Sequence, residues 1–314
     1  MVRLRRLART FAPMGLLLLA AACTTASQTA DLRDDPGDLP VRAAVADVPF
    51  FAQERYYCGP AAVAMTLAWT GLPVTQEDLV PQVYTPGREG TLQPDVVSAL
   101  RRNGRMAVPV DTLQGMLQEI AAGRPVLVFQ NLGLSWLPQW HFAVAIGYDL
   151  ESEELILHTG TWEARPVALA TFERTWARGG HWALVVLKPD QLPVADDEVE
   201  TLRAAAGLER VGRLREAETA YRTIAARWPR SFAAHLGLGN TRYALDDFAG
   251  AEAAYRDAIA AQPDESAPAW NNLAYVLAKL GRLEAAVAAA ERAVELGGAE
   301  DPNYRATLAE ISAM

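Results

Sequence analysis

The stretch Gln53-Glu-Arg-Tyr-Tyr-Cys58-Gly-Pro-Ala-Ala-Val-Ala-Met-Thr-Leu67 places a single cysteine at the start of an apolar helix. Gly59 and Pro60 interrupt the preceding chain, and proline at the first helical position sacrifices no intrahelical hydrogen bond. Residues 61–67 are apolar almost all round, which predicts a buried helix. A thiol at that position faces the positive end of the helix dipole, which favours the nucleophilic thiolate.

Two interpretations of Cys58 follow. In the first, Cys58 is a nucleophile, and Gln53, five residues upstream, donates its side-chain amide to a developing oxyanion. In the second, Cys58 is a small buried residue at a helix start, which is common for cysteine. The rest of the chain bears on the choice between them.

The composition bounds the class of protein. The chain has 314 residues, enough for two domains, and a formal net charge of -9. No basic face is evident, which argues against nucleic acid as a partner. There are two cysteines, Cys23 and Cys58.

The N-terminus has the pattern of an export signal, predicted over residues 1–22. Several arginines precede a short apolar run at 15–19, and Ala20, Ala21 and Ala22 then lead into Cys23. Small residues before a cysteine resemble the bacterial lipobox, whose cysteine is acylated and becomes the new N-terminus. The alternative is a plain secretory signal cleaved near Ala22. Lipidation at Cys23 would leave Cys58 as an unpaired thiol in an exported protein. Residues 23–44 are polar and predict a flexible tether.

Residues 45–190 are predicted to form an α+β domain with helices first and a mostly antiparallel sheet after them. Residues 126–129 indicate a buried strand, and residues 141–148 and 154–158 a strand pair around a polar turn. His141 opens that pair and could act as a base for Cys58, since imidazole titrates near neutral pH. With the turn near Glu151, His141 lies across from about residues 159–162, which brings His158 close.

These features together resemble a known enzyme family. Gln53-x4-Cys58-Gly-Pro-Ala, then residues 141–149, then Phe172 and Trp176 are similar to the bacteriocin-processing (double-glycine) peptidases of the papain-like clan and their stand-alone relatives. The resemblance covers about residues 48–188. It implies a papain-like fold in which Gln53 is the oxyanion residue, Cys58 the nucleophile and His141 the base.

One position departs from the family. Its members usually carry Asp-Pro after the second strand of the hairpin, and that Asp orients the histidine; here the sequence is His158-Thr-Gly160. We therefore expect His158 to serve as a weaker third catalytic residue, or the site to be degenerate. No short spacing of ligands predicts a metal site or a cofactor.

Residues 188–198 form a linker that contains two prolines and an acidic run, and the second domain, predicted over residues 191–314, then repeats. Positions 34 residues apart recur, and a third copy is shifted by one extra residue. The recurring pairs are Tyr221 and Tyr255, Ala217 and Ala251, and Pro229 and Pro263. The pattern resembles the tetratricopeptide repeat, in copies at about 198–231, 232–266 and 267–300, followed by a capping helix.

The sequence thus predicts an α+β papain-like peptidase domain followed by an all-α tetratricopeptide solenoid. The first functional hypothesis is a lipid-anchored cysteine peptidase on the periplasmic side of a bacterial envelope, with the outer membrane favoured. The repeats would recruit a protein partner or substrate. The alternatives are an inactive papain-like protein that binds peptides or scaffolds an envelope complex, and an acyl- or amide-transferring relative that uses the same residues.

Overall fold

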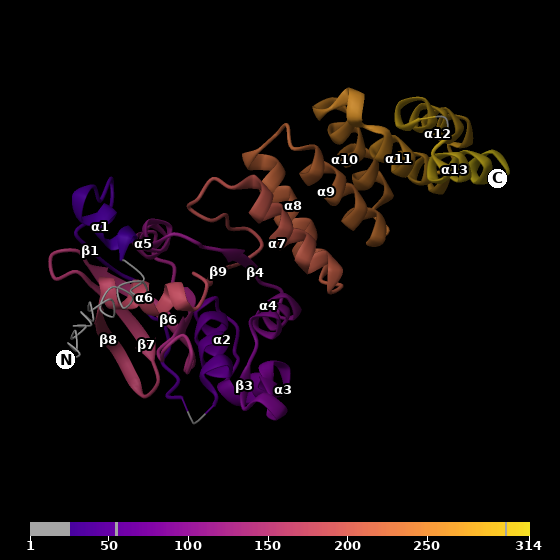
Figure 1. The fold of residues 1–314 in the computed structure, drawn as a ribbon. Coiled ribbons are helices and arrows are strands. Elements are labelled where there is room, and N and C mark those ends of the chain that lie inside the picture. The colour runs from indigo at the N-terminus through magenta and orange to yellow at the C-terminus, as the bar shows by residue number, and fades with distance from the viewer. Residues whose placement is uncertain (1–25, 54–55, 299) are drawn as a thin grey trace, which may run out of the picture.

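The structure is a computed structural model that describes residues 26–53, 56–298 and 300–314 (Figure 1). The predicted signal segment and Cys23 lie outside these residues. Within them, no helix is long and apolar enough to cross a membrane.

The N-terminal half contains a seven-stranded antiparallel sheet in its described residues. The strand order is β4-β9-β5-β6-β7-β8, and β1 pairs with residues 147–149 of β6, beyond the segment of β6 that pairs with β5. The strands are β1 (Arg42–Ala44), β4 (Met106–Pro109), β5 (Val126–Asn131), β6 (Trp140–Asp149), β7 (Glu154–Thr159), β8 (Trp162–Ala168) and β9 (Ala183–Leu187). The predicted strand at 126–129 and the predicted hairpin are both present, as β5 and as the β6–β7 pair.

Helices cover both faces of the sheet. On one face, α2 packs with α3 and α4 around Val63, Phe142 and Leu127. On the other face, α5 and α6 pack on alternate residues of the same strands, such as Ala143 and Val128, because neighbouring residues of a strand point to opposite sides. The elements are α2 (Cys58–Trp69), α3 (Gln76–Val83), α4 (Gln93–Arg102), α5 (Leu113–Ala121) and α6 (Leu169–Arg178), with a small hairpin of β2 (Tyr84–Thr85) and β3 (Gly90–Thr91).

Part of the predicted flexible tether is ordered, so that prediction is wrong for residues 27–44. They contain α1 (Ser27–Asp34) and β1. The carboxylate of Glu173 in α6 accepts hydrogen bonds from the backbone N–H groups of Gln28 and Thr29 at 2.9 and 2.7 Å, and from the Thr29 hydroxyl at 2.6 Å. A side chain about 145 positions away therefore caps α1.

The C-terminal half consists of helix pairs that extend away from the sheet (Figure 1). The pairs are α7 (Glu198–Arg210) with α8 (Leu214–Arg227), α9 (Phe232–Ala244) with α10 (Phe248–Ala261), and α11 (Ala267–Lys279) with α12 (Leu283–Gly297), followed by α13 (Pro302–Ser312). Each pair packs through small residues such as Ala217, Ala251 and Ala286, all fully buried.

The two halves share a hydrophobic core. Helix α7 packs against β4, the edge strand of the sheet, and contributes Ala204, Ala205 and Leu208 to the cluster that contains Leu113 and Val185. Covering the edge strand also protects backbone groups that would otherwise offer pairing to another chain. The first helix pair is thus fixed to the sheet.

Candidate active site

A cleft of about 980 Å³ opens at one end of the sheet. It is lined by the start of α2, the end of β5, the start of β6 and the β2–β3 hairpin, and three of its lining residues are Gln53, Cys58 and His141. The structure therefore brings together three of the four residues predicted for catalysis.

Cys58 is the first residue of α2, half-buried beneath the hairpin. Its pKa is raised from 9.0 because burial disfavours the thiolate, and backbone N–H groups of Phe142 and Gly59 offset only part of that effect. The backbone N–H groups at the helix start thus favour the thiolate, in the predicted direction, but burial raises the pKa by more.

His141 lies in the second position of β6, opposite Gln130 of β5. Burial lowers the pKa of its imidazole from 6.5 to about 4, so the ring is neutral at pH 7. Its Nε2 lies 2.7 Å from the hydroxyl oxygen of Thr159. That bond leaves Nδ1 to receive a proton from a neighbouring thiol.

The described hydrogen bonds include none between Sγ of Cys58 and the imidazole of His141. The resting pair is thus a neutral thiol and a neutral imidazole that line the same cleft. Catalytic hydrogen bonds are often long in unliganded enzymes and shorten when substrate binds.

His158 does not orient His141, so the prediction of His158 as a third catalytic residue is wrong. Its ring is 3% exposed and belongs to the face of the sheet that carries Phe50. Its Nδ1 accepts a hydrogen bond from the backbone N–H of Ala164 at 3.1 Å, and its Nε2 donates to the carbonyl of Val48 at 3.1 Å. Both nitrogens are therefore bonded to backbone groups, one in β8 and one in the segment before α2.

The sequence interpretation missed Thr159, whose hydroxyl lies beside His141. It follows His158 in β7, and neighbouring residues of a strand point to opposite faces. Pairing of Val144 with His158 puts His158 on the α2 face and leaves Thr159 toward His141. The register expected from the sequence placed residues 159–162 across from His141, and this range already included Thr159.

Gln53 is attached to the same end of the sheet. Its backbone N–H donates to the carbonyl of Gly160 at 3.0 Å, and its side-chain Nε2 approaches the carbonyl of Phe142 at 3.4 Å. The long second contact holds the amide weakly, so Nε2 is available to a stronger acceptor in the cleft.

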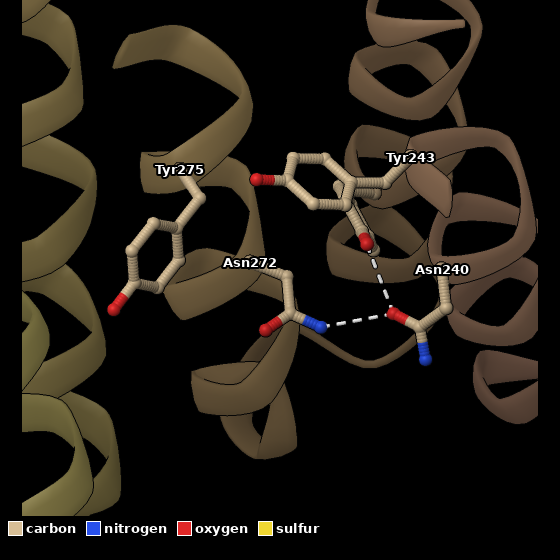
Figure 2. Close-up of a pocket in the computed structure, with 5 residues that line it drawn as sticks. Asn240, Tyr243, Asn272 and Tyr275 are labelled. Atoms are coloured by element: carbon tan, nitrogen blue, oxygen red, sulfur yellow. Dashed lines mark hydrogen bonds between the residues drawn. The ribbon is translucent and has the colours of Figure 1, made fainter. Parts of the chain in front are cut away.

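A second cavity, of about 390 Å³, lies in the repeats between α9 and α11 (Figure 2). The Oδ1 atom of Asn240 accepts hydrogen bonds from the Tyr255 hydroxyl at 2.9 Å and from Nδ2 of Asn272 at 3.0 Å. Tyr243 and Tyr275 complete the lining, and none of these residues is charged. Among the residues that the structure describes, no group of three or more His, Cys, Asp or Glu side chains is placed to hold a metal ion.

Comparison with protein families agrees with this division. The Peptidase_C39 like family matches residues 45–183, and the tetratricopeptide repeat family matches residues 202–266 and 239–304. The chain consists of a peptidase C39-like domain followed by tetratricopeptide repeats. The expected fold class is therefore confirmed.

Solved structures resemble each half of the chain. A protein of Bacillus anthracis described as a C39-like peptidase is 19% identical with a TM-score of 0.40, and the match covers 47% of this chain and 98% of that one. The Yersinia enterocolitica type III secretion chaperone SycD in complex with a YopD peptide is 20% identical with a TM-score of 0.35, covering 39% and 92%.

A third structure, the first TPR of Spaghetti (RPAP3) bound to an HSP90 peptide, is 21% identical with a TM-score of 0.35, covering 37% and 90%. No curated protein matches the chain. The likeness at these identities concerns the fold alone.

Proposed function

We propose that this protein is a cysteine peptidase. The observation that carries the proposal is the placement of Cys58, His141 and Gln53 around one cleft, with Nε2 of His141 bound to Thr159. The fixed ring can then present Nδ1 to the thiol, which gives a nucleophile, a base and an oxyanion donor in one site.

In the proposed reaction, Sγ of Cys58 attacks the carbonyl carbon of a peptide bond while its proton passes to Nδ1 of His141. Nε2 of Gln53 and the backbone N–H of Cys58 bind the oxyanion. The imidazolium protonates the leaving amine, the C–N bond breaks, and a thioester remains. His141 then deprotonates a water molecule, which attacks the thioester carbonyl. The C–S bond breaks, the acid product leaves, and the imidazolium returns its proton to Sγ of Cys58.

Unlike the thiolate–imidazolium pair that a carboxylate would support, a neutral pair must transfer its proton during the attack. The hydroxyl of Thr159 orients the ring but adds no negative charge to stabilise the imidazolium. We therefore expect a slower enzyme than one with an Asp at this position.

The test is cleavage of a denatured protein such as casein by the full chain, with new N-termini identified by mass spectrometry. Cys58→Ala and His141→Ala serve as controls. New termini that are absent with both variants support the peptidase. If the wild type yields no more new termini than Cys58→Ala, the peptidase proposal is replaced by the binding-protein alternative. Two observations favour that alternative: the thiol and imidazole are both neutral, and Thr159 supplies no negative charge. Transfer of the acyl group to an added amine would indicate the transferase instead.

We also propose that the repeats bind an extended, uncharged peptide segment in the cavity at Asn240. Nδ2 of Asn240 carries two hydrogens free for main-chain carbonyls, and the tyrosines offer apolar faces. Asn240→Ala should abolish capture of the partner or substrate by the repeats while cleavage of casein persists. Equal capture by the variant would place the partner elsewhere.

Export and lipidation at Cys23 are a separate proposal that rests on the sequence of residues 1–23. It places the protein on the periplasmic side of the envelope, held by a lipid in the outer membrane. Mass spectrometry of the N-terminal peptide from a bacterial membrane fraction tests it, with Cys23→Ser as the control. An unmodified N-terminus near residue 23 in the soluble periplasmic fraction would show a plain secretory signal.

A further inference from the structure

The connection between β5 and β6 carries an exposed apolar cluster. Leu134, Trp136 and Leu137, here called the hairpin tip, are 56%, 78% and 63% exposed. Large apolar side chains gathered on a surface commonly mark an interaction site. Trp136 is the most exposed of the large hydrophobic residues that the structure describes.

The hairpin tip is held rigidly. Leu134 and Leu137 exchange two backbone hydrogen bonds of 3.1 Å, with Ser135 and Trp136 forming the turn. At the base, Oδ1 of buried Asn131 accepts from the N–H groups of Gly133 and Gln139, both at 2.9 Å. The apolar side chains therefore project from a built scaffold, and a partner that binds them has little loop motion to arrest.

The chain runs directly from the hairpin tip to the cleft, although the tip residues themselves are not among those that line it. Gln139 at the end of the connection and Trp140 at the start of β6 both line the cleft, and Trp140 stacks on Phe129 with ring centroids 5.2 Å apart. The next residue is His141. Trp162, 62% exposed, lies at the same end of the sheet because β7 runs antiparallel to β6. Apolar groups thus border the reacting atoms.

The chemistry of the connection selects the kind of partner. Residues 131–140 contain no charged side chain. Surfaces that bind lipid headgroups usually combine aromatic residues with Lys or Arg, which this connection lacks. An apolar side chain of a polypeptide lying in the cleft fits the surface better.

We propose that the hairpin tip binds an apolar side chain of the substrate, close to the bond that Cys58 attacks. This inference rests on the proposed peptidase function, and it makes the hairpin tip the determinant of specificity. Burying one Leu or Phe side chain is expected to favour an apolar substrate by about tenfold or more.

The test compares two synthetic peptides that differ by replacement of Leu and Phe with Ser near a common cleavage site. The full chain is compared with Leu134→Ser/Trp136→Ser/Leu137→Ser. The control variant is Val194→Ser/Val199→Ser, which removes exposed apolar side chains from the linker and from α7. The ratio of kcat/KM for the two peptides should fall by about tenfold in the first variant only. An unchanged ratio overturns the proposal while leaving the peptidase in place.

A binding arm separates the two proposals. Fluorescence anisotropy of the same peptides with the Cys58→Ala chain, with and without the tip substitutions, needs no catalysis. A preference for the apolar peptide that disappears with the substitutions supports the hairpin tip even if the wild type cleaves neither peptide, in which case only the peptidase fails. Equal binding of both peptides overturns the hairpin tip proposal. The same chains are also sedimented with phosphatidylethanolamine–phosphatidylglycerol vesicles. If the tip substitutions abolish binding to the vesicles and leave the peptide preference unchanged, the surface binds a membrane and the hairpin tip proposal is overturned.

Discussion

Nε2 of His141 lies 2.7 Å from the hydroxyl oxygen of Thr159. A neutral hydroxyl thus occupies the place in which a carboxylate would stabilise the imidazolium. The bond fixes the ring orientation, while burial alone sets the pKa of His141 at about 4. Orientation and charge stabilisation are separable at this site, and substitutions of Thr159 can test each.

Thr159→Asp should raise the pKa of His141 from about 4, because a carboxylate beside Nε2 favours the charged ring. The acid limb of the pH–activity profile should move to higher pH, and NMR titration of the ring should follow it. Thr159→Val removes the hydroxyl at similar volume and should lower kcat/KM by on the order of tenfold, the value of one hydrogen bond. A Val variant with wild-type rate and profile would contradict the positioning role.

Stability should depend on pH through His141. Its pKa is about 4 in the folded protein and near 6.5 in the unfolded chain, so the unfolded state binds more protons between these values. The resulting stability is fully present above pH 6.5 and is lost as the pH falls toward 4, by about 3 kcal/mol. Urea unfolding at a series of pH values should show this loss, and the His141→Gln curve should be flatter by that amount. Parallel curves would refute the assignment.

Cys58 should react slowly with iodoacetamide at pH 7, because burial raises the pKa of the thiol above 9.0. The alkylation rate should rise with pH, and its apparent pKa should be higher than that of a free cysteine. In Thr159→Asp the reaction should become faster at neutral pH, since a more basic imidazole stabilises the thiolate. A wild-type titration well below 9.0 would show that the thiol and imidazole already form an ion pair.

The sequence predicted the parts of the site that depend on local pattern. The break at Gly59 and Pro60 placed Cys58 at a helix start, and alternating residues after His141 placed the base at a strand start. The choice between His158 and Thr159 depended on a single residue of register, and a shift of one reverses which face a side chain takes. Residues 27–44 are ordered because Glu173, far along the chain, bonds to the start of α1. No local sequence pattern indicates this contact.

Gly59→Ala should disturb the cleft. A Cβ at Gly59 would lie 2.3 Å from Oγ1 of Thr91, so the β2–β3 hairpin would have to move. We expect a loss of about 1–3 kcal/mol in the free energy of unfolding and faster alkylation of Cys58 as the cover opens. Gly87→Ala, in the same hairpin with nothing within 4 Å, is the matched control and should change neither quantity. Equal effects of the two substitutions would show that the contact with Thr91 is unimportant.

Glu119 should hold the linker between the two halves. It is 2% exposed, and its carboxylate accepts from the N–H of Val194 at 2.6 Å and from Nη1 of Arg124 at 3.0 Å. Nη1 of Arg124 also donates to the carbonyl of Leu192 at 2.6 Å. Glu119→Leu leaves the half-buried guanidinium of Arg124 without its carboxylate and the N–H of Val194 without its acceptor, which should cost about 1–3 kcal/mol and speed hydrogen exchange at Val194.

Glu119→Gln keeps an acceptor for the N–H of Val194. Its free energy of unfolding should therefore lie between those of Glu119→Leu and the wild type. The control is Asp196→Asn, which breaks an exposed ion pair of 2.6 Å with Arg227 in the same linker and should cost less than about 1 kcal/mol. Limited proteolysis between residues 190 and 197 should follow the same order, because a freed linker becomes accessible to the protease. If Glu119→Leu is cut no faster than Asp196→Asn, the packing of α7 on β4 alone fixes the repeats to the peptidase C39-like domain, and the hydrogen bonds of Glu119 contribute little.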